Sequence, residues 1–339
     1  MAQARIAAAG AGALAVAYYA LRRPPAADEL PNPQKNRAFV FVKPHADTIS
    51  VEDMVRDELK GKAMIVKAEG DLTAETIDEK KLIDQHYYAI ASKATILKPS
   101  ELNIPKEKFQ KTFGKSWDSV LSEGKALNAM DACKELGVDA EGLNKLWQAA
   151  KKNDKLAKFG GGFYCGEIQH KGKTLYVFNG FFMTMRSAFT APGRKIHYYD
   201  VEWEPSGLSW SDFRGKVLGP TDPKDAPKDS LRGKVLGNWK KLGLKAEPNV
   251  GDNAVHASAS PFEALAERMN WMGVKCPEDD YCKAMLKAGI PQNVIEEWTK
   301  DPQVKILPDG KRGSLFDALE DLDADACLAK AKELYKLQQ

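Results

Sequence analysis

The sequence lacks the charge pattern of a nucleic-acid-binding protein. Its 50 lysine and arginine residues nearly balance 47 aspartate and glutamate residues, and the formal net charge is only +3. No block of five or six like charges occurs, so nucleic acid is not indicated as a partner. Any anionic ligand must therefore be bound by a local cluster of basic residues.

Cysteine is scarce and is not arranged for metal binding. The five cysteines include no C-x-x-C pair, and their odd number favours reduced thiols. Cys276 and Cys282 have no histidine nearby, and their spacing is poor for a zinc site. A disulfide between these two residues remains open.

Long hydrophobic runs are also missing, with one marginal exception near the N-terminus. Residues 6–21 carry no charge and are flanked by Arg5 and by Arg22 and Arg23. As a helix they would span about 24 Å, less than the roughly 30 Å hydrocarbon core of a bilayer. The first acidic residue is Asp28, and an arginine-bearing, acid-poor start is typical of a mitochondrial or plastid presequence.

We therefore expect residues 1–22 to be a targeting or membrane-anchor segment. An organelle, with the mitochondrion favoured, is the expected location, and residues 6–21 would make any membrane contact. Prolines at 24, 25, 31 and 33 predict that residues 23–36 form a linker. The full sequence has the composition of a soluble globular protein, with 43% hydrophobic and 29% charged residues. The globular part should begin near Arg37.

Hydrophobic periodicity predicts a mixture of strands and helices. Strands are expected at 38–42, 63–67, 175–178, 181–185 and 196–203. Helices are expected at 51–59, 77–93, 109–125, 126–136, 140–151, 209–217, 261–272, 279–288, 291–299 and 324–337. Helix N-caps are predicted at Asp118, Asp139, Ser230 and Ser260.

Gly172-Lys173-Thr174 suggests a phosphate-binding P-loop at first sight. The preceding glycine, Gly166, is one position too far away, and Thr174 begins a predicted strand rather than a helix. A hairpin with its turn at Lys171-Gly172 fits these residues better.

His256 stands where a strand is expected to turn into a helix. Short apolar residues precede it, and Ser260, Pro261 and Glu263 suit the N-cap, first and third positions of a helix. Such a junction fixes the imidazole on rigid backbone near helix N–H groups that favour an anion such as phosphate. A lone histidine is more often structural than nucleophilic, so this segment alone does not decide its role.

Four stretches, in matching order, resemble the signature segments of the nucleoside diphosphate kinases. They are Phe-Val-Phe-Val-Lys-Pro at 39–44, Gln-His-Tyr at 85–87, Leu-Gly-Pro-Thr-Asp-Pro at 218–223 followed by Leu-Arg-Gly at 231–233, and Asn-Ala-Val-His-Ala-Ser at 253–258. One departure follows Lys43-Pro44, where the family usually has Asp-Gly and this chain has His45-Ala46.

The resemblance implies a ping-pong phosphotransferase that moves the γ-phosphate of ATP, or of another nucleoside triphosphate, to a nucleoside diphosphate through phosphorylated His256. Lys43 would neutralise phosphate charge, while Ser258 and Glu267 would steer the imidazole. The implied nucleotide-binding residues are Lys43, Tyr87, Thr221, Arg232, Asn253 and one basic residue near 215, for which we favour Arg214 over Lys216. Loss of Arg232 is expected to reduce turnover with little effect on stability.

Magnesium is the implied cofactor, held mainly by the nucleotide phosphates, so no protein metal site is expected. The implied fold is α+β, a ferredoxin-like antiparallel sheet covered by helices over residues 37–275. Because the four matches are widely spread, a large helical and hairpin insertion is expected at about 95–195. Residues 276–339 should form a helical C-terminal extension, and a homo-oligomer is compatible with the sequence.

A second interpretation is a catalytically silent scaffold that keeps this fold within a membrane-anchored or organellar assembly. The N-terminal segment and the insertion motivate that alternative. The presence of Lys43, Arg232, Asn253 and His256 favours an enzyme.

Overall fold

The structure, a computed structural model, describes residues 35–339. The expected targeting segment at 1–22 and nearly all of the expected linker lie outside the described residues. No helix within 35–339 has the length and apolar character needed to cross a membrane. The first strand begins at Asn36, whose buried side chain donates to Asp323 at 2.7 Å and accepts from the N–H of Ala324 at 2.9 Å. The folded part thus starts just before Arg37.

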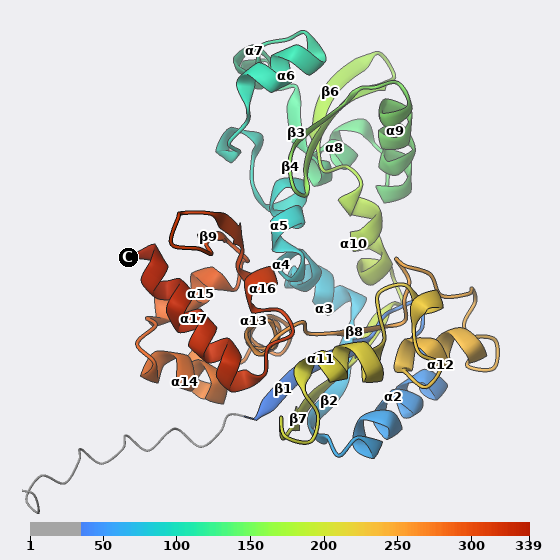
Figure 1. Cartoon of the computed structure of the whole chain (residues 1–339). Helices are drawn as coiled ribbons and strands as arrows, with labels where there is room; N and C mark the ends of the chain where they lie inside the picture. The colour runs from blue at the N-terminus through green and yellow to red at the C-terminus, as the bar shows by residue number, and fades with distance from the viewer. Residues whose placement is uncertain (1–34) are drawn as a thin grey trace, which may run out of the picture. The chain divides into compact units, whose positions relative to one another are not determined.

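A four-stranded antiparallel sheet organises the chain (Figure 1). Its strands stand in the order β2-β7-β1-β8, with bounds Ile65–Thr73, Lys195–Trp203, Asn36–Val42 and Val255–Ala257. In chain order the fourth strand lies beside the first, and the third lies between the first and the second. This is the strand order of a ferredoxin-like arrangement, and the molecule is a mixed α and β protein.

β1 is buried on both faces because its side chains alternate between two hydrophobic clusters. Ala38, Val40 and Val42 join the cluster that includes residues of α2 (Ile49–Gly61) and α12 (Leu231–Asn238). Phe39 and Phe41 join the other cluster. The helices on that side are α3 (Ala74–Glu79), α4 (Leu82–His86), α10 (Phe182–Thr190) and α13 (Pro261–Trp271).

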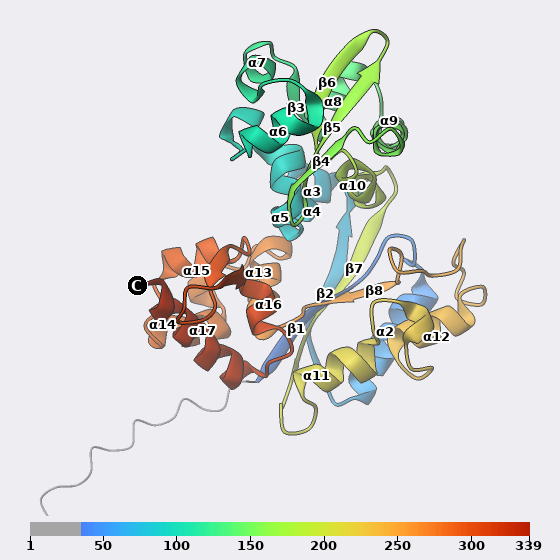
Figure 2. The same ribbon diagram turned by 45° about the horizontal axis from the view of Figure 1, so that its top comes forward.

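The chain between β2 and β7 contains a second sheet with the strand order β3-β6-β5-β4 (Figure 2). Their bounds are Ala126–Asn128, Lys173–Phe178, Phe163–His170 and Leu156–Gly160. Helices of this region are α5 (Tyr88–Ala91), α6 (Lys106–Phe113), α7 (Trp117–Ser122), α8 (Ala129–Leu136) and α9 (Ala140–Lys152). The two ends of the region meet, since Thr73 pairs with Lys195 across β2 and β7.

Several local predictions hold and others are wrong. The Lys171-Gly172 hairpin is confirmed, with φ of 47° and 78° at its two turn residues, as a type I′ turn requires. The helix predicted at 109–125 is two helices, because Gly114 takes a left-handed φ of 69° and ends α6. Ser116, not Asp118, caps α7. Residues 126–128, predicted as helix, form β3 instead.

The strand predicted at 181–185 is also wrong. Asn179 has a left-handed φ of 48° and its side chain accepts from the N–H of Tyr164 at 2.9 Å and donates to the carbonyl of Ile90 at 2.9 Å. These contacts end β6 at Phe178 and redirect the chain into α10. An aromatic run that is typical of a strand is therefore helical.

Residues after α13 form a helical region with a short hairpin. Its elements are α14 (Asp280–Lys287), α15 (Gln292–Trp298), β9 (Gln303–Lys305), β10 (Arg312–Ser314), α16 (Leu315–Leu319) and α17 (Ala324–Gln338). They share a hydrophobic cluster with Phe262 and Leu265 of α13. Cys276 and Cys282 are joined by a disulfide, so the preference for reduced thiols is wrong for this pair.

Candidate active site

The imidazole of His256 is positioned by the sheet. β8 runs antiparallel to β1 with His256 directly opposite Phe41, so both side chains lie on one face. Their rings are stacked with centroids 4.6 Å apart. The chain enters β8 through Ala254, which has a left-handed φ of 69° and donates its N–H to Nε2 of His45 at 3.1 Å. His45, which departs from the family pattern, thus supports the turn before His256.

Glu267 of α13 holds one side of the His256 ring. Its Oε1 lies 2.6 Å from Nε2 of His256, and its Oε2 accepts a 2.5 Å hydrogen bond from Oγ of Ser258. Ser258 is fully buried, and its Oγ accepts from the N–H of Phe39 at 3.0 Å. Both carboxylate oxygens are therefore fixed, and the imidazole is fixed through them.

The hydrogen bonds assign the proton of the neutral ring. A carboxylate can only accept, so Nε2 of His256 carries the proton that it donates to Glu267. Within residues 35–339 no hydrogen bond is made to Nδ1 of His256. The lone pair of Nδ1 is then available as a nucleophile.

Burial sets the charge states of this pair. Desolvation, followed by the positive charges of Lys43 and Arg232, holds the pKa of His256 well below its ordinary value, so the ring is neutral at pH 7. Burial also raises the pKa of Glu267 to about 7. The carboxylate that accepts from His256 therefore forms as the pH rises through about 7.

A cavity of about 470 Å³ opens beside His256 and gathers most of the predicted nucleotide-binding residues. Its wall includes Lys43, Arg214, Thr221, Arg232, Asn253 and His256. Nζ of Lys43 donates to the carbonyl of Gly251 at 3.2 Å. Burial, followed by the charge of Arg232, lowers the pKa of Lys43 to about 8, so this ammonium group loses its charge as the pH rises through that value.

Arg232 of α12 connects β8 with the loop at Gly219 beside this cavity. Its Nε and Nη2 donate to the carbonyl of Val255 at 3.2 and 2.9 Å, and its Nη1 donates to the carbonyl of Gly219 at 2.8 Å. Burial, with the charge of Arg214, lowers its pKa to about 10, which keeps it cationic at neutral pH. Because these bonds link β8 to the loop at 219, we now expect loss of Arg232 to reduce stability as well as turnover, in contrast to the expectation from sequence.

Arg214 reaches the same cavity but is engaged by the C-terminal region. Its Nη1 donates to Glu320 at 2.6 Å and to Asp321 at 2.7 Å. Burial works against the charge of Arg214, but these hydrogen bonds outweigh it and raise its pKa. Lys216 instead pairs with Asp212 and does not line the cavity.

Asn253 provides an unsatisfied acceptor in the cavity wall. Its Nδ2 donates to the carbonyl of Thr221 at 3.0 Å, whereas its Oδ1 is buried and finds no hydrogen-bond donor among residues 35–339. A buried amide oxygen without a donor costs about 1–3 kcal/mol. A ligand hydroxyl that reached Oδ1 would remove this penalty.

Tyr87 does not line the same cavity. It lies on a second cavity of about 450 Å³, whose wall combines residues 85–90, α13, Thr299, Lys300 and Phe316. Among the described residues, His256 and Glu263 line both cavities. Burial raises the pKa of Tyr87 to about 12, so its hydroxyl keeps its proton. The predicted nucleotide contact of Tyr87 therefore requires a ligand that passes beside His256.

His86 belongs to the site, although sequence reasoning included it only as part of a motif. Its side chain is 6% exposed, and its Nδ1 lies 3.4 Å from Oε1 of Glu267. The same Nδ1 accepts a 3.4 Å hydrogen bond from Nε1 of Trp271. Burial, followed by the charge of His256, lowers the pKa of His86 to about 3. The Gln85-His86-Tyr87 match was the only sequence signal for this residue.

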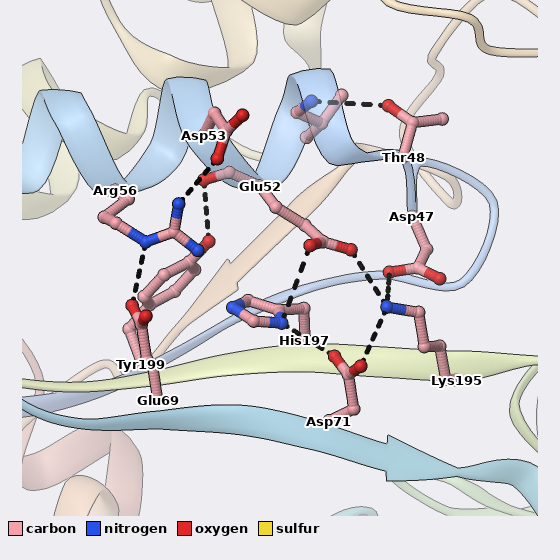
Figure 3. A network of polar contacts seen from close by, with 11 residues as sticks. Asp47, Thr48, Glu52, Asp53, Arg56, Glu69, Asp71, Lys195, His197 and Tyr199 are labelled. Atoms are coloured by element: carbon pink, nitrogen blue, oxygen red, sulfur yellow. Dashed lines mark hydrogen bonds and ion pairs between the residues drawn. The ribbon is translucent and has the colours of Figure 1, made fainter.

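A second histidine–carboxylate cluster lies on the opposite face of the sheet, because His197 pairs with Val42 rather than with Phe41 (Figure 3). Nδ1 of His197 lies 2.7 Å from Asp71. Nζ of Lys195 lies 3.0 Å from Glu52 and 3.1 Å from Asp71. We call Asp47, Glu52, Asp71, Lys195 and His197 the lysine cluster, because the Lys195 ammonium group stands among its carboxylates.

No protein-family model matches the chain, and no curated protein matches it. Three solved nucleoside diphosphate kinases resemble the structure. The Encephalitozoon cuniculi enzyme is 12% identical, with 70% of this chain and 90% of that chain covered and a TM-score of 0.34. The Pyrobaculum aerophilum enzyme is 17% identical, with 72% of this chain and 98% of that chain covered and a TM-score of 0.34. The Aquifex aeolicus enzyme is 14% identical, with 72% of this chain and 99% of that chain covered and a TM-score of 0.35. These scores are too low to support a function, which must rest on the geometry of the site.

Proposed function

We propose that the chain is a phosphotransferase of the nucleoside diphosphate kinase type, with His256 as the carrier of the phosphoryl group. The observation that supports this most is the arrangement around the ring. Nε2 is held by Glu267, while Nδ1 is without a partner in the described chain and the residue borders a cavity lined by Lys43 and Arg232. A fixed neutral imidazole beside buried cations suits attack on a phosphoryl group.

In the first half-reaction, Nδ1 of His256 would attack the γ-phosphorus of a nucleoside triphosphate such as ATP. The nitrogen–phosphorus bond forms as the bond from phosphorus to the bridging oxygen breaks, and the nucleoside diphosphate leaves with that electron pair. In the second half-reaction, a terminal phosphate oxygen of another nucleoside diphosphate attacks the same phosphorus, and the electron pair of the broken bond returns to Nδ1. One pocket thus serves donor and acceptor in turn, which gives ping-pong kinetics.

The cavity residues would position the ligand and stabilise charge. Lys43 and Arg232, which line the cavity with His256, would neutralise the phosphoryl oxygens. Positioning and electrostatics account for most of the catalysis of phosphoryl transfer. Oδ1 of Asn253 would accept from a sugar hydroxyl, since it has no donor within the described chain. Arg214 would join the phosphate contacts only by giving up Glu320 and Asp321.

Magnesium is the proposed accompanying ion, and it would neutralise the phosphate oxygens when bound. We call the cavity of about 470 Å³ beside His256 the phosphate cavity. The carboxylates that line it include Glu320 and Asp321, and both are ion-paired with Arg214. Oxygen atoms of the nucleotide phosphates are hard ligands that suit this ion. We therefore propose that the phosphates, rather than protein side chains, hold it.

The labelling experiment that tests this function uses purified protein with ATP and magnesium. One phosphoryl group per chain should be incorporated, and a nucleoside diphosphate of any base should remove it. As a phosphoramidate, the label should be lost in acid and survive base, unlike a phosphoserine on Ser258 or Ser260. His256→Ala should abolish labelling, whereas His197→Ala in the lysine cluster should keep it.

Absence of label in the folded wild-type protein, or its persistence in His256→Ala, would contradict the proposal. Either result would favour the alternative, a catalytically silent scaffold. Circular dichroism of each variant separates loss of chemistry from loss of fold.

A further inference from the structure

Three metal-binding donors converge on the wall of the second cavity. One ring nitrogen of His86, one ring nitrogen of His256 and a carboxylate oxygen of Glu267 lie within 4.8 Å of one another. The contacts with Oε1 of Glu267 are made by Nδ1 of His86 and by Nε2 of His256. All three residues line the cavity of about 450 Å³ that also contains Tyr87. Two imidazoles and one carboxylate form the donor set of transition-metal sites that keep an open coordination position.

The spacing of these donors is close to that of a tetrahedral ion. With metal–ligand bonds of about 2.0–2.1 Å, tetrahedral donors stand about 3.4 Å apart. The contact between His86 and Glu267 already measures 3.4 Å. The pair formed by Glu267 and His256 must open from 2.6 Å, and the two imidazole nitrogens are within 4.8 Å. All three residues border the cavity of about 450 Å³, which has room for a water as a fourth ligand.

Among residues 35–339, the ion-pair partners of Glu267 are His86 and His256, with no lysine or arginine. Nδ1 of His86 accepts a hydrogen bond from Nε1 of Trp271, and Nε2 of His256 donates to Glu267, so a bound ion would replace these two hydrogen bonds. The lysine cluster differs here, because Nζ of Lys195 already lies 3.0 Å from Glu52 and 3.1 Å from Asp71 (Figure 3).

We propose that His86, His256 and Glu267 bind one transition-metal dication of the zinc or cobalt class. Magnesium prefers six oxygen ligands, so it would remain with phosphates and not enter this site. Coordination at Nε2 of His256 displaces the proton from that nitrogen, and the neutral ring then carries it on Nδ1. The bound ion therefore removes the lone pair needed for phosphoryl transfer, a consequence that rests on the proposed function.

Cobalt titration of the metal-free protein tests the site without reference to activity. One equivalent of Co²⁺ should produce the visible absorption of a four-coordinate ion, and Zn²⁺ should displace it. His86→Gln should weaken cobalt binding at least tenfold, as expected for loss of one of three protein ligands. His197→Gln is the matched control and should bind as the wild type does. If His86→Gln does not fold, His256→Ala replaces it and should lose cobalt binding as well.

Either of two results would overturn the metal site. The first is that Co²⁺ produces no visible absorption of a four-coordinate ion in the wild-type protein. The second is that wild type and the folded variant, His86→Gln or His256→Ala, bind cobalt with equal affinity. The inhibitory consequence is read as the ratio of labelling rates with and without one equivalent of Zn²⁺. In wild type the labelling rate with Zn²⁺ should be at least tenfold lower than without it, and a chelator should restore the rate. In His86→Gln the ratio of the two rates should stay near one. Wild-type protein that is never labelled refutes the proposed function but leaves the cobalt result intact, so the two failures are distinguishable.

Discussion

Two histidine–carboxylate clusters lie on opposite faces of one sheet, and they differ in what balances their carboxylates. In the lysine cluster the ammonium group of Lys195 stands between Glu52 and Asp71, and Nε2 of His197 is buried without a partner in the described chain. Around His256 the carboxylate of Glu267 is shared between a hydroxyl and two neutral rings, and the ring of His256 borders two cavities. A histidine is thus available for chemistry where one nitrogen is held and the other remains accessible.

The largest expected contrast compares Arg232→Ala with Arg56→Ala. Arg56 lies near the lysine cluster and donates to Glu69 at 2.9 Å (Figure 3). Arg232→Ala should slow labelling by about 10³-fold, because a cation that meets transition-state charge on phosphoryl oxygens is lost. It should also lower the free energy of unfolding by about 2–3 kcal/mol, since its charged hydrogen bonds to two carbonyl groups are lost. Arg56→Ala should leave the labelling rate within about twofold of wild type. Rapid-quench labelling and urea unfolding measure both quantities, and equal labelling rates in the two variants would contradict the assignment.

A smaller kinetic effect is expected at the carboxylates. Glu267→Gln should slow labelling by about 10 to 10³-fold, because an amide no longer fixes the tautomer of His256. Asp71→Asn, which removes the carboxylate on His197, should leave the labelling rate unchanged and lower stability by less than about 1 kcal/mol, since Asp71 is half exposed. If both variants behaved alike in the labelling assay, Glu267 would have no orienting role.

The labelling rate should change by roughly tenfold per pH unit on the acidic and on the alkaline side of its optimum. Below about 7 Glu267 gains a proton and no longer accepts from His256, so labelling falls as the pH decreases. Above about 8 Lys43 loses its charge, so labelling falls as the pH increases. Labelling should therefore be maximal between about 7 and 8. Lys43→Arg should remove the alkaline limb, and a profile that is unchanged by this substitution would exclude Lys43 as its cause.

The smallest effect concerns the acidic pair on Arg214. Replacing Glu320 with Gln and Asp321 with Asn together should tighten binding of a nucleoside diphosphate by about three- to tenfold, because Arg214 is released towards the phosphate cavity. Glu333→Gln, which removes a comparable surface ion pair with Lys330, is the control and should not change affinity. Calorimetric titration gives both dissociation constants, and weaker binding in the double variant would show that the pair supports the cavity instead.

The sequence predicts β1 and β7 to within two residues, because β1 is an uninterrupted apolar run and β7 is a long strand pattern. The strand expected at 63–67 is placed less well, since β2 continues to Thr73. Ser260, Ser230 and Asp139 cap helices as expected, each accepting from an N–H three residues later. The failures lie where tertiary contacts override local preference. The bonds of Asn179 end β6, and the left-handed Gly114 divides a predicted helix.

Within the candidate site, motif matches located the residues but not their partners. Lys43, Thr221, Arg232 and Asn253 do line one cavity with His256. Tyr87 lines another cavity together with Thr299, Lys300 and Phe316, which are distant in sequence and lie in a region without motif signals. The ion pairs of Arg214 with Glu320 and Asp321 are likewise contacts that no spacing rule reveals.

The pairing of Thr73 with Lys195 has a consequence for folding kinetics. β2 and β7 form an extensive antiparallel ladder, yet the whole second sheet lies between them in the chain. Closing a loop of this length costs roughly 3–4 kcal/mol more conformational entropy than closing a two-residue turn. The second sheet, whose own hairpin is local, should therefore acquire its structure first and bring the two strands together, so that the face carrying His256 is completed late in folding.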